Sequence, residues 1–272
     1  MLMAWGQFLA HDMVLTPESS EPRQQINQIT AFIDASNVYG SSEEETDALR
    51  NKTTDGTLTG DERVNTVPNL IMMHLMFARE HNRIVKILDE YHSRWGEKKK
   101  FQEARKIVGA LMQHITYSEY LPKILSQAYM DSNGLGNTAN DPYDTSVNPG
   151  IINGYGSAAG RSPIDVDFYV GGISEIHVPG ASVGPTFACV INKQFESLKK
   201  GDRFWYERND SMDSVVGLSS DQIAAIKGVT LATVMCNNLG ITKVQPDVFQ
   251  VISESNALQD CSNYNFDLTP WE

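Results

Sequence analysis

The chain has 272 residues, a formal net charge of −12 and a pI near 4.9, with 41% hydrophobic and 21% charged residues. A chain of this length can bury a core as one large domain or two small ones, and its composition is ordinary for a soluble globular protein. The acidity excludes nucleic acid and anionic membranes as favoured partners, because their phosphates attract a basic surface. No apolar run approaches the roughly 18 residues that a membrane-spanning helix needs, so we expect no transmembrane segment.

The N-terminal segment and the cysteines give weak and conflicting signals about location. Met1–Trp5 is apolar but lacks the basic residues and the small-residue cleavage site of a signal peptide. We interpret it as a helix entered midway and expect the natural N-terminus to be missing. Sequons at Asn51 and Asn209 favour a secreted glycoprotein. An odd number of cysteines leaves one thiol over in a secreted protein, whereas three scattered cysteines are unremarkable in a cytosolic one; they are Cys189, Cys236 and Cys261.

Taken in chain order, the periodicity of apolar residues predicts three clear helices. The first covers 70–88, with His81 on its apolar stripe, and the second covers 101–115, shortly before Pro122. The third opens at Ser219 with a capping-box pattern and runs to Val234. Residues 131–163 are rich in Asn, Gly, Ser and Pro and are expected to form a loop. Strand signals are few and short, so the predicted fold class is mainly α.

The first candidate site is a polar cluster near the N-terminus. Gln7 and His11 are four residues apart and share one face of a helix, whereas Asp12 points about 100° away from His11. A buried imidazole can act as a general base near neutral pH. The alternative is a structural histidine bonded to a nearby carbonyl, and these three residues alone favour that alternative.

A series of longer motifs favours a functional role for this cluster over the structural alternative. In order along the chain they are WGQFLAHD (5–12), TAFIDASNVYGS (30–41), GDERVN (60–65), MH followed by REHNR (73–83), ARKIVGA with ITY and YLP (104–122), VGPTFAC (183–189) and GDRFWY (201–206). Together they cover nearly the whole chain and resemble the animal haem peroxidases, the family of myeloperoxidase, peroxidasin and the peroxinectins. The resemblance implies a mainly α, haem peroxidase-like helical domain with few short strands.

The resemblance assigns the polar cluster a role in cleaving hydrogen peroxide. It implies that His11 is the base that moves the proton, that Arg63 is the cation that stabilises developing charge, and that Gln7 lies beside the peroxide or a halide. All three would contact a haem b cofactor. For Arg63 the alternative is a surface arginine in an acidic turn. The implied function is hydrogen-peroxide-dependent oxidation of small donors, including a response to oxidative stress.

The resemblance also implies a calcium site. Calcium prefers oxygen ligands, and Thr30, the carbonyl of Phe32, Asp34 and Ser36 alternate along a loop that would place them on one side. Asp12 would complete the site from the helix that carries His11. The alternative is an ordinary Asx or Ser turn. The remaining histidines are interpreted as structural; they are His74, His81, His92, His114 and His177.

Several family features are missing from this sequence. Ala10 and Thr66 stand where mammalian relatives attach haem through carboxylates, so any haem would be non-covalent. After residues 153–159 the family pattern continues to the histidine that ligates iron, but Ile164 falls at that position and the helices that follow in the family are absent. Ile164 cannot coordinate iron, so no proximal ligand is predicted. A shorter omission is expected between Glu18 and Arg23.

We therefore expect one partial peroxidase domain, with the distal haem and calcium part in 1–160 and the C-terminal part in 161–272, joined across an internal deletion. Loss of core helices should expose apolar faces. The resemblance pairs Cys236 with Cys261 in an oxidising compartment and leaves Cys189 without its partner, and it implies an extracellular protein.

Because the iron ligand is absent, activity of this chain is doubtful and two alternatives stay open. One is a non-catalytic fragment that binds a cell-surface adhesion partner through Lys200-Gly201-Asp202. The other is a nonfunctional product of splicing or of a faulty gene model.

Overall fold

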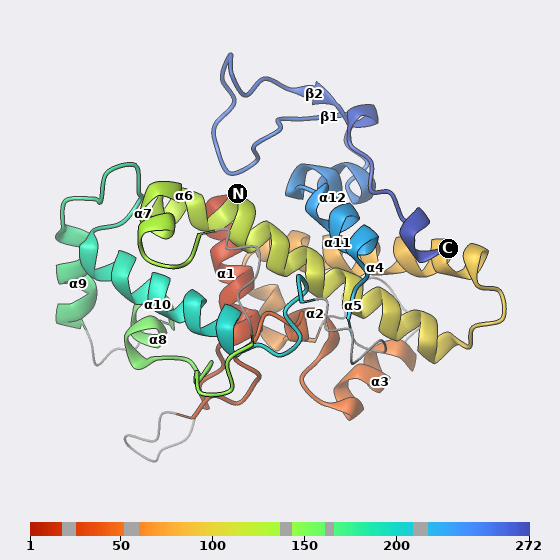
Figure 1. Cartoon of the computed structure of the whole chain (residues 1–272), viewed down its shortest axis with the longest axis horizontal. Helices are drawn as coiled ribbons and strands as arrows, with labels where there is room; N and C mark the ends of the chain where they lie inside the picture. Colours follow the sequence, from red (N-terminus) through yellow and green to blue (C-terminus); the bar gives the residue numbers. More distant parts are fainter. Residues whose placement is uncertain (18–25, 52–59, 137–142, 161–165, 209–216) are drawn as a thin grey trace.

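The computed structural model describes residues 1–17, 26–51, 60–136, 143–160, 166–208 and 217–272. Within these ranges the chain is mainly helical, as the sequence predicts (Figure 1). The α-helices are α1 (Leu2–Met13), α2 (Ser36–Tyr39), α3 (Glu43–Asn51), α4 (Pro68–Tyr91), α5 (Glu97–Ile115), α6 (Leu121–Leu125), α7 (Gln127–Ser132), α8 (Asn153–Gly160), α9 (Val166–Ser174), α10 (Pro185–Gly201), α11 (Ser220–Lys227) and α12 (Leu231–Asn238).

Shorter elements complete the described fold. Two-residue strands β1 (Lys243–Val244) and β2 (Gln259–Asp260) pair antiparallel, with Lys243 opposite Asp260. A 3-10 helix, η1 (Glu62–Thr66), precedes α4, and a π-helical turn, η2 (Thr116–Tyr120), joins α5 to α6. Two further 3-10 turns lie near the C-terminus, η4 (Cys261–Asn263) and η5 (Thr269–Trp271).

The two long helices α4 and α5 form the frame on which the other elements pack. Pro68 occupies the first turn of α4, where the missing N–H costs nothing. The apolar stripe predicted for 70–88 is buried along α4, including Leu70, Phe77 and Leu88. α1 lies across this frame because Trp5 and Phe8 both contact Phe77, with ring centres 5.8 and 5.3 Å apart. These aromatic contacts fix the rotation of α1, and with it the direction of the polar cluster.

Two predicted boundaries are wrong. The capping box at Ser219 is present, but the helix that it opens ends at Gly228, and a second helix, α12, begins after Thr230 with its own capping box. Two N-terminal caps in one apolar stretch favour two short helices over a single helix to Val234. The expected loop 131–163 contains α8.

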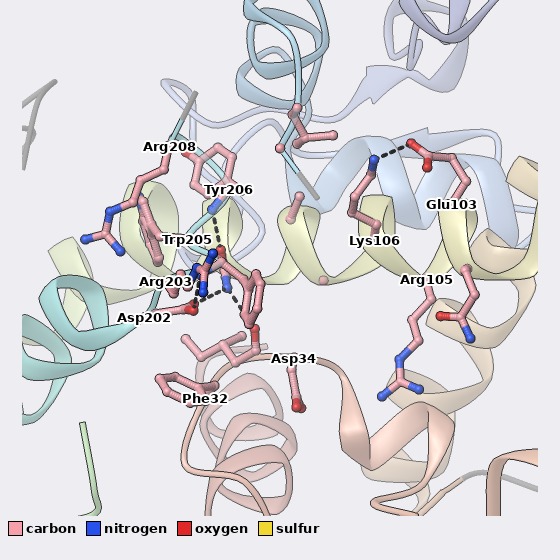
Figure 2. A pocket seen from close by; sticks show the side chains of 18 of the residues that line it. Phe32, Asp34, Glu103, Arg105, Lys106, Asp202, Arg203, Trp205, Tyr206 and Arg208 are labelled. Carbon is pink, nitrogen blue, oxygen red and sulfur yellow. Dashed lines mark hydrogen bonds and ion pairs between the residues drawn. The ribbon is translucent and has the colours of Figure 1, made fainter. Parts of the chain in front are cut away.

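The motif segment 201–206 packs against α5 (Figure 2). The buried Gln113 side chain donates to the Asp202 carboxylate at 3.1 Å and accepts from the Tyr206 N–H at 3.0 Å. Asp202 also accepts from the Phe204 N–H at 2.7 Å. Gln113 therefore links both ends of this segment to the frame helix α5.

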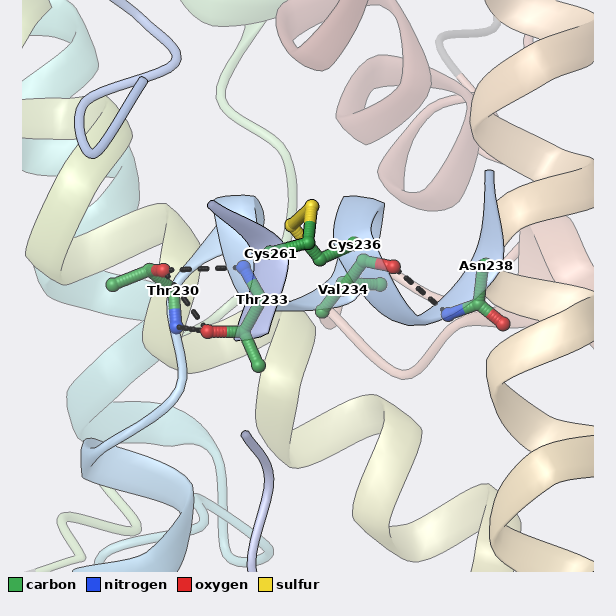
Figure 3. The surroundings of a disulfide bond; sticks show 6 residues. All are labelled: Thr230, Thr233, Val234, Cys236, Asn238 and Cys261. Carbon is green, nitrogen blue, oxygen red and sulfur yellow. Dashed lines mark hydrogen bonds between the residues drawn. A yellow bond between two sulfur atoms is a disulfide. The ribbon is translucent and has the colours of Figure 1, made fainter. Parts of the chain in front are cut away.

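The disulfide Cys236–Cys261 links two segments near the C-terminus, as the resemblance implies (Figure 3). It joins α12 to η4, beyond the β1–β2 hairpin. Cys189 is a free, exposed thiol.

An apolar face around α9 has no cover among the described residues. Tyr169, Val170 and Ile173 are 44 to 56% exposed, and Ile176 is 92% exposed. α9 directly follows residues 161–165, which lie outside the described residues and include the junction of the predicted internal deletion. That deletion stays a prediction.

Candidate active site

The C-terminal end of α1 and the η1 turn meet through one arginine. Asp61 begins η1 and accepts from the Arg63 N–H at 2.7 Å. The Arg63 guanidinium pairs with the Asp61 carboxylate and also donates to the carbonyl oxygens of Val14 at 2.8 Å and His11 at 3.0 Å. Because the last carbonyls of a helix lack partners within it, Arg63 closes the end of α1.

His11 lies beside this ion pair and is nearly buried. Its Nδ1 is 3.9 Å from an Asp61 carboxylate oxygen and makes no hydrogen bond. Burial, and then the positive charge of Arg63, lower the pKa of His11 to about 4, against the opposing charge of Asp61. The imidazole is therefore neutral at pH 7 and can accept a proton.

Gln7 lies on the accessible side of α1. Met3, Gln7, Ala10 and Val14 recur at helical spacing and all keep some exposure, whereas the opposite face of the helix is buried. This strip leaves the surface next to His11 open. The structure thus brings His11 and Arg63 together and places Gln7 one turn away on the same helix.

Sequence reasoning missed the roles of Asp61 and His74. Asp61 could have been found from its position two residues before Arg63 at a helix start, where its side chain caps the backbone and pairs with the arginine. His74 is fully buried, with its ring centre 6.4 Å from that of His11 and 4.9 Å from that of Phe8. Neither ring nitrogen makes a hydrogen bond of normal geometry. Burial, and then the charge of His11, lower the pKa of His74 to about 4. His11 therefore lies beside a second imidazole that is neutral at pH 7.

All six histidines lie within the described residues, and His74 has its ring centre 6.4 Å from that of His11. Three bond other protein groups: His81 Nδ1 with the Tyr39 hydroxyl (2.9 Å), His92 Nε2 with the Trp271 carbonyl (2.7 Å) and His114 Nδ1 with the Tyr206 hydroxyl (2.9 Å). His177 is exposed after α9. His74 is fully buried against Phe8, so its imidazole has no open face toward which a haem could be placed.

The residues present therefore fit a haem on its distal side only. Ile164, at the position of the family's iron ligand, lies outside the described residues. Ala10 and Thr66 offer no carboxylate for an ester bond, and Thr66 Oγ1 donates to the Arg63 carbonyl instead.

The predicted calcium ligands converge around Asp12. This buried carboxylate accepts from the N–H groups of Ala35 and Asn37 at 3.2 Å and from the Ser36 hydroxyl at 3.1 Å. Ala35 adopts a left-handed backbone with φ of 62°, which an alanine disfavours, and its bond to Asp12 helps to hold that conformation.

Asp34 lies next to this cluster, where it accepts from Thr30 Oγ1 at 2.8 Å and from the Ser36 N–H at 3.0 Å. Burial, and then the charge of Asp34, raise the pKa of Asp12, whereas its hydrogen bonds oppose the rise. A cation would relieve this repulsion, so the donor set fits calcium.

The fit is incomplete in one respect. The described residues hold no cluster of three or more histidine, cysteine or acidic side chains placed to bind a metal, so the site rests on two carboxylates.

Comparison with known proteins agrees with this architecture. The sequence model of the animal haem peroxidase family matches residues 18–59, 51–164 and 161–249. The chain belongs to the animal haem peroxidase family. The second and third stretches meet at 161–164, where the internal deletion is expected; the break at 51–59 was not expected.

The relatives are distant and longer. The chain is 24% identical to the human "Peroxidasin homolog" over 432 aligned positions, covering 95% of the chain and 28% of that protein. It is 23% identical to dog "Thyroid peroxidase", in a match that covers 90% of this chain and 44% of that protein. Because 432 positions exceed the chain's 272 residues, the relative carries long stretches without a counterpart here. The fold is similar to that of peroxidase A from Dictyostelium discoideum, with a TM-score of 0.71 and 20% identity. The match covers 91% of this chain and 86% of that structure.

Two further predictions concern the adhesion tripeptide and a membrane-spanning helix. Asp202, the acidic residue of the predicted adhesion tripeptide, is only 4% exposed and is bonded to Gln113, so its carboxylate is not displayed to a partner. Among the described helices, none has both the length and the apolar character needed to cross a bilayer.

Proposed function

We propose that this chain serves hydrogen-peroxide-dependent oxidation of small donors and retains the proton-transferring half of that site. The observation that carries the proposal is the arrangement of His11, Asp61 and Arg63 at the end of α1. A neutral imidazole accepts a proton from hydrogen peroxide, and the guanidinium beside it favours the negative charge left on the oxygen. Gln7 offers an amide on the same accessible strip.

The electron-transferring half is the part that this chain lacks. Reduction of hydrogen peroxide to water also takes electrons from the donors, and haem iron supplies that chemistry in the family. Because no described histidine can ligate the iron from the far side, we propose that the chain alone turns over peroxide no faster than free hemin does. Any role of this chain in the response to oxidative stress therefore requires an iron ligand supplied from outside the chain.

The test is a peroxidase assay with hemin and a phenolic donor, run with and without imidazole as an external iron ligand. Imidazole should raise turnover by the wild-type chain, and His11→Gln should abolish the gain. His177→Gln is the matched control, since it removes an exposed imidazole far from this cluster. An equal gain in the His11→Gln variant would refute the proposal.

We also propose that Asp12, Thr30, Asp34, Ser36 and the Phe32 carbonyl bind calcium. The supporting observation is the pair of adjacent carboxylates, one of them fully buried, which accept hydrogen bonds from the Thr30 and Ser36 hydroxyls. Calcium should raise the unfolding temperature relative to a chelator. Asp34→Asn should remove the shift, whereas Glu254→Gln, on an exposed loop, should keep it. A shift that survives Asp34→Asn would place any calcium elsewhere.

The disulfide supports an oxidising, extracellular location, and we propose glycosylation at Asn51 and Asn209 on the same basis. Expression through a secretory pathway should give a chain whose mass falls on treatment with a glycosidase specific for N-linked glycans. Retention of the mass of the bare polypeptide would contradict this.

A further inference from the structure

A cavity of about 920 Å³ lies away from the His11 cluster (Figure 2). Its walls are one face of α5, the loop at 32–34 and the segments 202–208 and 217–218. None of Gln7, His11 and Arg63 lines it, although Phe32 and Asp34 of the proposed calcium site do. The cavity therefore presents chemistry that the proposed reaction with peroxide does not use.

Two cations on α5 lie at this cavity without a carboxylate partner. Arg105 is half-buried, with its guanidinium 5.1 Å from the centre of the Tyr39 ring, and Lys99 lies one and a half turns earlier over the Trp95 ring. Neither forms an ion pair with a carboxylate of the described residues, whereas the neighbouring Lys106 pairs with Glu103 at 2.7 Å. In a chain of net charge −12, unpaired cations at a cavity favour an anionic ligand.

The rest of the wall is mixed. Phe204, which is 61% exposed, supplies aromatic surface in front of the buried Ile33, Ala110 and Trp205, while the carboxylates of Asp34, Glu103 and Asp202 also line the cavity. Gly109 lies in the middle of α5, and a Cβ built on it would meet no atom within 4 Å. Glycine inside a helix costs about 1 kcal/mol relative to alanine, so this position gives up helix stability and leaves open space at the cavity.

We propose that this cavity binds a small organic anion with an apolar body, with the acidic group at Arg105 and Lys99 and the body against Gly109 and Phe204. Arginine suits a planar carboxylate or a sulfonate, and the aromatic and aliphatic wall suits a hydrocarbon chain or an aromatic ring. Long-chain and aromatic acids share this chemistry.

The test uses anilinonaphthalene sulfonate, which combines a sulfonate with aromatic rings, as a fluorescent probe of the full chain. The wild-type chain should bind one equivalent saturably. Arg105→Gln should weaken binding at least tenfold, and Arg105→Lys should restore part of it. Gly109→Leu should abolish binding by filling the space, while circular dichroism and the unfolding temperature report a folded helix.

Two controls separate this cavity from other surfaces. Arg94→Gln removes an exposed arginine of the same charge, and Ile173→Ser alters the apolar face of α9; both should leave the affinity unchanged. Decanoate and naphthoate, used as competitors, distinguish a long-chain from an aromatic acid, and displacement by either supports the proposal. Absence of saturable binding, binding unchanged in Arg105→Gln and Gly109→Leu, or binding lost in Ile173→Ser would overturn it.

Discussion

At the scale of single residues, the one guanidinium of Arg63 makes two kinds of contact at once. It pairs with Asp61 beside His11, and it donates to the carbonyl oxygens of His11 and Val14 at the end of α1. The position of Arg63 is therefore fixed by backbone contacts as well as by its ion pair.

Removing this arginine should destabilise the fold as well as the site. Arg63→Gln leaves the Asp61 carboxylate unpaired and two helix carbonyls without donors, which should lower the free energy of unfolding by roughly 1–3 kcal/mol. Urea unfolding measures the change. Arg94→Gln, on an exposed turn, should have no effect. Equal stability of the two variants would mean that the contacts of Arg63 contribute nothing.

Glu119 gives a prediction with a defined pH dependence. It accepts from the Leu231 N–H at 2.9 Å, and burial chiefly raises its pKa to about 7 against that bond. An ionised carboxylate is therefore costly in the folded chain at pH 8, and the cost disappears as the pH falls through 7 toward 4.5, the ordinary pKa of a glutamate.

Glu119→Gln keeps the acceptor oxygen and removes the charge. It should raise the free energy of unfolding by roughly 1–3 kcal/mol at pH 8 and by little at pH 4.5. Urea unfolding at the two pH values measures this, with the exposed Glu90→Gln on α4 as the control. An equal effect at both pH values would contradict the account.

At the scale of elements, the sequence predicts much of the fold because long periodic helices and long motifs are local signals. The stripes of α4 and α5 and the capping box at Ser219 are present. The break between α11 and α12 was missed because the apolar pattern continues across Gly228, and only the second cap marks it.

In the candidate site, the residues that face one another could be predicted only in part. His11 and Arg63 follow from the motifs, but the contacts of Arg63 with the end of α1 depend on a tertiary approach across 52 positions. The position of His74 behind His11 depends in the same way on how Phe8 and Phe77 set the rotation of α1.

The disulfide is the element whose contribution can be measured separately. Cys236 and Cys261 are 25 residues apart, and closing a loop of that length should stabilise the fold by roughly 3 kcal/mol. Replacing both by serine should lower the midpoint of urea unfolding accordingly. Cys189→Ser, which removes only the exposed free thiol, should leave the midpoint unchanged. A larger loss in Cys189→Ser would contradict the pairing.

At the scale of the whole molecule, one side of the described helical core is uncovered. The apolar residues of the α9 face are exposed, and α9 follows the point at which two stretches of the family match meet. Apolar patches of this kind promote association.

We expect the chain to self-associate with increasing concentration. Ile173→Glu should reduce the association measured by sedimentation or light scattering, because it charges the centre of the α9 face. Val251→Glu, on the exposed C-terminal hairpin, should reduce it less. If the two variants behave alike, the α9 face is not the cause.

The predicted deletion would account for a half-complete site. The proposed base His11 and Arg63 come from α1 and η1, whereas Ile164 stands at the position where the family resemblance predicts the iron ligand. Family membership and the catalytic competence of this chain are therefore separate properties.

The most direct measurement is a hemin titration of the purified chain, read from the Soret band and carried out in parallel on Gly109→Leu to exclude uptake by the anion cavity. We predict gradual uptake with no one-to-one endpoint and no spectrum of histidine-ligated iron. A sharp one-to-one endpoint with a histidine-ligated spectrum would contradict the account, because it would mean that another side chain has replaced the missing ligand.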